Sequence, residues 1–72
     1  MAEKAVTLEQ IIHVVPHRGF ANGEWQSLCM ISTGEVTWMH VAFGETPEAA
    51  LEGSRDWLAA SKVKLEAGET IP

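Results

Sequence analysis

The strongest structural signal in the sequence is the start of a helix at Thr46-Pro47-Glu48. Thr46 is a favourable N-cap residue, Pro47 suits the first helical position because its missing N–H is not needed there, and Glu48 places negative charge against the helix dipole. The predicted helix covers about residues 47–61. Its apolar and small residues recur at helical spacing and form one stripe: Ala50, Leu51, Ser54, Trp57, Leu58 and Ser61.

The residues before this helix predict a hairpin. Two segments, 25–32 and 35–43, are rich in β-branched, aromatic and long apolar side chains, and Thr33-Gly34 fits a two-residue loop between them. If Ser32 pairs with Glu35, one face carries Trp25, Ser27, Cys29, Ile31, Val36, Trp38, His40 and Ala42. The other face then carries Gln26, Leu28, Met30, Thr37, Met39, Val41 and Phe43. This second face is the more aliphatic, and we expect the helix to pack on it.

The first apolar run, residues 8–15, fits two structures. Its β-branched residues favour a strand, whereas the spacing of its apolar residues and a capping box from Thr7 to Gln10 also fit a helix. We predict a strand, because eight residues make only about two helical turns and a two-stranded hairpin needs further support. The predicted fold is α+β, a small antiparallel β-β-β sheet with one C-terminal helix packed on one face, in a single domain spanning residues 1–72.

The sheet face that the helix leaves uncovered would be strongly apolar under this prediction. Its candidate partner-binding residues are Trp25, Ile31, Val36, Trp38 and His40. Monomers seldom expose large contiguous apolar patches, and tryptophans often anchor interfaces. We therefore expect a protein partner on this face, and a homodimer in particular. The alternative is that the ends of the chain, including residues 62–65, fold over it.

A second candidate binding feature is acidic. Glu45 precedes the predicted helix, and Glu48, Glu52 and Asp56 follow at four-residue spacing on its exposed side. They form either a solvated face or a negative stripe that docks on a basic partner surface. The net charge is -5, and phosphates repel an acidic surface. We therefore do not expect the chain to bind nucleic acid directly.

Residue spacing gives little support for catalysis or metal binding. His13 and His17 are four residues apart, but Pro16 interrupts any helix that would align them, and Cys29 has no second cysteine. Cys29 and His40 could meet across the hairpin, yet no third group orients the imidazole. We expect no enzymatic activity, no metal and no cofactor.

Cysteine content and the first residues indicate the compartment. The one cysteine cannot form an internal disulfide, and Met1-Ala2-Glu3-Lys4 lacks the basic and apolar regions of a signal peptide. No apolar run approaches the ~20 residues of a membrane span. We expect a cytoplasmic protein that does not bind membranes.

The run Phe43-Gly44-Glu45-Thr46-Pro47-Glu48-Ala49-Ala50-Leu51-Glu52 resembles the strand-to-helix junction of the HicB antitoxin family, and the order of signals from Ile11 onward is similar. This resemblance implies a β-β-β-α fold, dimerisation through the sheet and neutralisation of a small basic RNase toxin. The features of the chain together predict a non-enzymatic protein-binding module, such as an inhibitor or regulator of a phage or mobile element. A HicB-like antitoxin and a small Cys/His enzyme are the alternatives.

Overall fold

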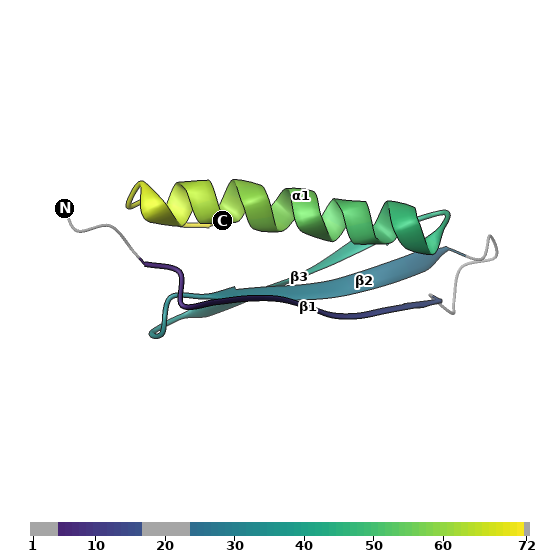
Figure 1. Cartoon of the computed structure of the whole chain (residues 1–72), viewed down its shortest axis with the longest axis horizontal. Coiled ribbons are helices and arrows are strands. Elements are labelled where there is room, and N and C mark those ends of the chain that lie inside the picture. Colours follow the sequence, from purple (N-terminus) through teal and green to yellow (C-terminus); the bar gives the residue numbers. More distant parts are fainter. Residues whose placement is uncertain (1–4, 17–23, 72) are drawn as a thin grey trace.

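The computed structural model describes residues 5–16 and 24–71, which form a three-stranded antiparallel sheet with one helix lying along one face (Figure 1). The elements are β1 (Leu8–Pro16), β2 (Trp25–Ser32), β3 (Thr37–Gly44) and α1 (Pro47–Glu66), and the sheet order is β1-β2-β3. The predicted α+β fold is confirmed. The first apolar run is a strand, as predicted.

β1 contains one irregularity that decides which of its residues face the helix. Ile11 pairs with Cys29 and His13 pairs with Leu28, so Ile12 is an extra residue with no partner position on β2. Side chains alternate along a strand, and an extra residue therefore exchanges the two faces for all that follows. As a result, His13 points to the side of the sheet opposite to that of Ile11.

The β2–β3 hairpin has a wider loop than the predicted Thr33-Gly34 turn. Ser32 pairs with Thr37 rather than with Glu35, so residues 33–36 form the loop. The Ser32 hydroxyl oxygen accepts from the N–H of Gly34 at 3.1 Å and from the hydroxyl of Thr37 at 3.2 Å, and Gly34 adopts a positive φ of 92°. This register differs from the predicted one by two positions, and every paired residue keeps its predicted face because side chains alternate with a period of two.

α1 begins at the predicted residue, Pro47. The extended backbone of Thr46 (φ -130°, ψ 159°) lets its Oγ1 accept from the N–H of Ala49 at 3.1 Å, which is N-cap geometry. Gly44 ends β3 where the chain turns back over the sheet, and a Cβ there would lie 2.6 Å from the backbone nitrogen of Ala50. The junction from strand to helix thus needs a residue without a side chain at position 44.

α1 ends at Glu66, about one turn beyond the predicted end. Leu65 continues the stripe that faces the sheet and is fully buried, so the additional turn adds apolar burial. The helix stops where Gly68 takes a positive φ of 81° and its N–H donates to the carbonyl oxygen of Leu65 at 3.0 Å. The chain then returns to the core, where Ile71 is buried.

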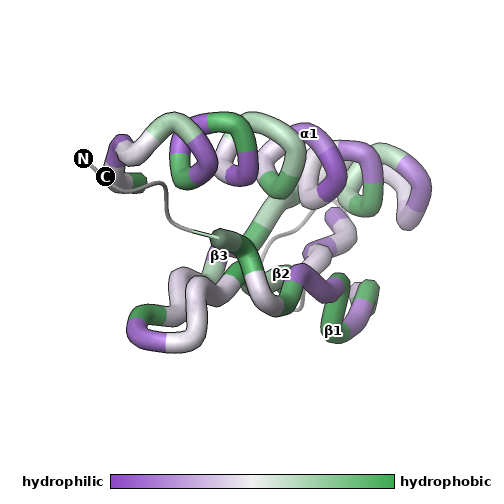
Figure 2. The backbone as a smooth tube through the Cα atoms, turned by 60° about the vertical axis from the view of Figure 1, so that its left-hand side comes forward, coloured by the Kyte–Doolittle hydropathy of each residue, from purple (hydrophilic) through white to green (hydrophobic). Residues whose placement is uncertain are grey.

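α1 packs on the face of the sheet opposite to the one we expected. The buried core cluster consists of Cys29, Ile31, Leu58, Leu65 and Ile71, with Val6, Ile11, Trp38 and Trp57 packed against it. In Figure 2 the helix likewise lies on one side of the strands. The face that we predicted to stay free is therefore covered by α1 and by both described chain ends, and we call it the covered face.

Small side chains on the covered face let α1 approach the sheet closely there. A Cβ added at Gly53 would lie 2.9 Å from the Cβ of Ala42, and the Ser54 hydroxyl lies 2.6 Å from that of Ser27. The helix therefore approaches the sheet closely along these residues. The aliphatic face carries long side chains along the middle of the sheet, which would hold a helix further away.

Candidate functional site

The sheet surface that α1 does not cover is built from four cross-strand rows, and we call it the open face. Strand pairing places one residue from each strand in a row. The rows are Leu8–Ser32–Thr37, Gln10–Met30–Met39, His13–Leu28–Val41 and Val15–Gln26–Phe43. Long apolar side chains occupy every row.

Several apolar side chains of the open face are strongly exposed. Leu8 is 46% exposed, Phe43 51% and Met39 58%, and they come from both edge strands. Leu28 and Met30 lie between them on the central strand and are half-buried by their neighbours. Ile12, in the irregularity of β1, is also exposed. Contiguous apolar surface of this kind usually marks an interaction site.

The open face carries no Asp, Glu, Lys or Arg at any of its positions. This is unusual in a chain of which 21% is charged and whose net charge is -5. Glu9, the one such residue within the three strands, pairs with Ile31 on the covered face. The open face therefore lacks these four residue types, although five of its twelve paired positions are polar: Gln10, His13, Gln26, Ser32 and Thr37.

The predicted apolar binding residues lie mostly beneath the helix. Ile31 is fully buried, and Trp25, Trp38 and His40 are half-buried on the same covered face. Val36 is exposed, but it lies in the β2–β3 loop and not in the sheet. These residues were expected to form one docking surface, and the packing of α1 uses that surface for the core instead.

Cys29 and His40 are direct cross-strand partners, but their reactive groups do not meet. The Cys29 thiol is fully buried and donates to the backbone carbonyl oxygen of His40 at 3.5 Å. The His40 ring instead stacks on Trp57 of α1, with the ring centroids 4.8 Å apart and the planes 6° from parallel. This geometry gives the imidazole a packing role and leaves the thiol without a general base.

The acidic residues lie on a different side of the molecule from the open face. Glu48, Glu52 and Asp56 are exposed on α1, at helical positions away from its buried stripe, and Glu45 is exposed just before the helix. Because the buried stripe of α1 rests on the covered face, this acidic row points away from the sheet. The acidic row and the open face therefore cannot contact the same flat partner surface.

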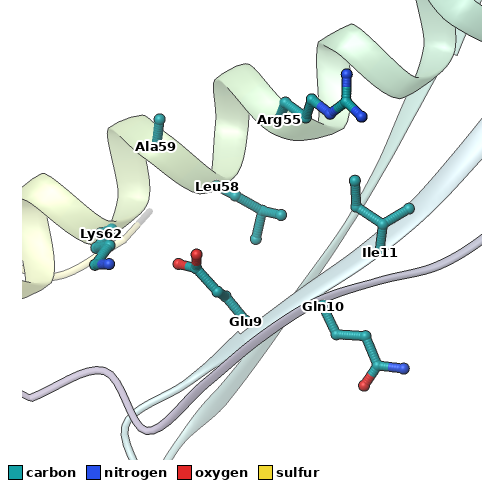
Figure 3. Close-up of a pocket in the computed structure, with 7 residues that line it drawn as sticks. All are labelled: Glu9, Gln10, Ile11, Arg55, Leu58, Ala59 and Lys62. Atoms are coloured by element: carbon teal, nitrogen blue, oxygen red, sulfur yellow. The ribbon is translucent and has the colours of Figure 1, made fainter.

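A groove of about 440 Å³ runs between β1 and α1 (Figure 3). Ile11 and Leu58 point toward each other across it, and Glu9, Arg55 and Lys62 lie around them. The groove thus has one carboxylate and two cationic side chains around the apolar side chains of Ile11 and Leu58. Mixed charge at its rim selects no single class of ligand.

Other candidate sites find no support in residues 5–16 and 24–71. In these ranges no three His, Cys, Asp or Glu side chains cluster in a way that could hold a metal ion. His17, one of the histidines considered as a ligand, lies outside the described residues. Nor does the described part of the chain contain a helix with the length and apolar character needed to cross a bilayer.

Comparison with known proteins found no matching family model, no matching curated protein and no matching solved structure.

The sequence did contain a signal for the open face. Along β2 and β3 one alternating set includes Ser27, Cys29 and Ala42, whereas the other is built mainly from long side chains. Small residues on a strand permit close approach of a helix, and Gly53 and Ser54 supply the matching small residues on α1. The match between these small residues favours the face of Ser27 and Ala42 for the helix.

Proposed function

We propose that this chain is a non-enzymatic protein-binding module whose docking surface is the open face of the sheet. The observation that carries the proposal is a face without Asp, Glu, Lys or Arg, with exposed Leu8, Met39 and Phe43, in an otherwise acidic protein. Exposed apolar side chains are unfavourable in water, and their burial against another protein lowers the free energy.

Two further features support a binding role over catalysis. The Cys29 thiol is buried, and the His40 ring is held by Trp57. A nucleophile needs an accessible thiolate and a base within hydrogen-bond reach, and these two residues offer neither. We also propose a cytoplasmic location, because a free and buried cysteine suits a reducing compartment.

The acidic row supports binding indirectly. Glu48, Glu52 and Asp56 are exposed and point away from the open face. Charges in such positions keep a protein with an apolar face soluble, and they orient it as it approaches a partner. We assign them this role and not direct contact with the partner.

The test is site-specific photo-crosslinking in cells of the source organism. A benzophenone amino acid replaces Met39 on the open face or, as the control, Val63, which is 68% exposed on α1. We expect one defined adduct from position 39, identified by mass spectrometry, and none from position 63. The same adducts from both positions, or no adduct from position 39, would contradict the proposal.

A further inference from the structure

We propose that the occupant of the open face is a second copy of this chain, bound sheet to sheet about a two-fold axis. This inference rests on the proposed docking function of that face and names its partner. The resulting dimer has four layers, with the two sheets in the middle and the two α1 helices outside. Such packing places the two sheets about 10 Å apart, as in a β-sandwich.

The charge distribution permits a second copy on the open face. Two chains with a net charge of -5 repel each other unless their charges stay far apart. In the sheet-to-sheet arrangement the α1 helices lie on opposite outer sides. Standard spacings between layers place the two helix axes about 30 Å apart. That distance is several times the Debye length of ~8 Å at physiological ionic strength, so salt screens the repulsion between the charges of the two helices.

The absence of charge on the open face also discriminates between partners. A basic partner would bind best to a surface that supplies carboxylates, and these lie on α1 at Glu48, Glu52 and Asp56. A face without Asp, Glu, Lys or Arg instead fits another face without them, because no carboxylate, ammonium or guanidinium group is then buried unpaired. The open face meets this condition against itself, as a two-fold interface requires.

The size of the open face suits a modest dimer. Strands of this length span about 26 Å, and three strands span about 14 Å across, so the flat outline of the face is roughly 360 Å². Projecting side chains raise its accessible surface to about one and a half times that value, and one copy can then bury roughly 500–600 Å². Two copies then bury roughly 1,100 Å², near the lower end of stable protein interfaces. We therefore expect a dissociation constant in the micromolar range.

The described ends of the chain leave the open face available. Val6 packs against the core cluster, and Ile71 belongs to it, so both lie on the side of the sheet that carries α1. The backbone N–H of Thr7 donates to the carbonyl oxygen of Ser32 at 2.9 Å. This hydrogen bond continues the pairing of β1 with β2, so the chain at Thr7 does not cross the open face. In residues 5–7 and 67–71, therefore, nothing crosses the open face.

Sedimentation equilibrium on the purified full chain tests the proposal, at protein concentrations from about 1 µM to about 500 µM, which bracket a micromolar dissociation constant. Wild type is compared with Met39→Lys on the open face and with Val63→Lys on the outer side of α1. Both substitutions replace an exposed apolar side chain and add one positive charge. Circular dichroism verifies that each variant folds, and Leu8→Lys is a second open-face variant on a different strand.

We expect the mass of wild type and of Val63→Lys to rise from 7.9 kDa toward twice that value as concentration increases. Met39→Lys and Leu8→Lys should raise the dissociation constant by at least about 100-fold, because a two-fold axis buries each introduced charge twice. A wild type that stays monomeric overturns the proposal. So does a dimer that both open-face variants leave intact, since that result assigns the contact to a free strand edge.

The two proposals fail in different ways. A monomeric wild type together with a single adduct to another protein from position 39 would overturn only the homodimer, and the open face would remain a docking surface. An adduct of twice the chain mass from position 39 would support both. The absence of any adduct from position 39, together with monomeric behaviour, would overturn both.

Discussion

At the scale of single residues, the structure depends on a few small side chains between α1 and the sheet. Ser54 is fully buried on α1, and its hydroxyl lies 2.6 Å from the hydroxyl of Ser27 and 3.2 Å from the carbonyl oxygen of the same residue. The Ser54 hydroxyl donates to Ser27 in a place that water does not reach. Such a pair contributes orientation more than net stability, but its cost is large when only one partner is left.

Replacement of one partner should therefore destabilise more than replacement of both. We expect Ser54→Ala to lower the free energy of unfolding by about 1–3 kcal/mol, because the Ser27 hydroxyl then stays buried without its partner. The double variant Ser27→Ala with Ser54→Ala should lose less than the sum of the two single losses. Urea denaturation of all four proteins measures this coupling, and strictly additive losses would show that the hydroxyls do not interact.

Gly53 provides a second residue-scale prediction. In an exposed helix Gly→Ala stabilises by about 1 kcal/mol, but here the new Cβ would lie 2.9 Å from the Cβ of Ala42. We expect Gly53→Ala to lower the free energy of unfolding by about 1–3 kcal/mol, because α1 must shift away from β3. Thermal unfolding checks the sign. The addition of Ala42→Gly, which removes the clashing carbon, should recover part of the loss, whereas a stabilised single variant would contradict the close approach.

At the scale of elements, α1 has local signals at its start and tertiary packing at its end. Its beginning coincides with the Thr46 cap and Pro47, both readable in the sequence. The last turn contains the exposed Lys64, and the burial of Leu65 holds this turn against the sheet. Most helical stability in proteins comes from the packing of one face.

The cap predicts an effect that depends on side-chain chemistry. Thr46→Ala should lower the free energy of unfolding by about 1 kcal/mol, because the N–H of Ala49 loses its acceptor. Thr46→Ser is the matched control and should stay close to wild type, since its hydroxyl can accept the same hydrogen bond. Chemical denaturation compares the three proteins. Equal losses in both variants would indicate that the methyl group of Thr46 matters and the cap does not.

At the scale of the whole molecule, the core is one-sided. Cys29, Ile31, Leu58 and Leu65 are buried between α1 and the sheet, and Ile71 closes one end. The other side of the same three strands remains uncovered in the described residues. A single layer of core in a chain of 72 residues supplies only a few kcal/mol of stability. Burial of the open face in a complex would therefore add substantially to the stability of the fold.

A single core residue near the C-terminus should therefore have a large effect. We expect Leu65→Ala to lower the free energy of unfolding by about 2–5 kcal/mol, because it leaves a cavity at the end of the core. Val63→Ala, two residues away and 68% exposed, should change it by less than about 0.5 kcal/mol. Urea unfolding at equal protein concentration measures both. Similar behaviour of the two variants would mean that the last turn of α1 does not pack on the sheet.

The sequence determined the elements and the division of the strands into faces. Three apolar runs, the Thr46-Pro47 helix start and side-chain alternation predict the β-β-β-α order and the residues that share a side of the β2–β3 hairpin. Gly53 lies inside α1 where the helix approaches the sheet closely, a position that a glycine within a helix often occupies. These features depend on capping, turns and periodicity, which act over a few neighbouring residues.

The tertiary structure decided which face α1 covers, and with it the candidate site. The greater number of long aliphatic side chains favours the face of Met39 and Phe43 for the core, yet the helix packs on the face of Ser27 and Ala42, where small side chains allow close contact. The predicted anchor Ile31 becomes core as a consequence, and the aliphatic face becomes the candidate docking surface. Choosing between two apolar faces depends on the fit of side chains across a layer, which brings together residues distant in sequence and which local patterns do not specify.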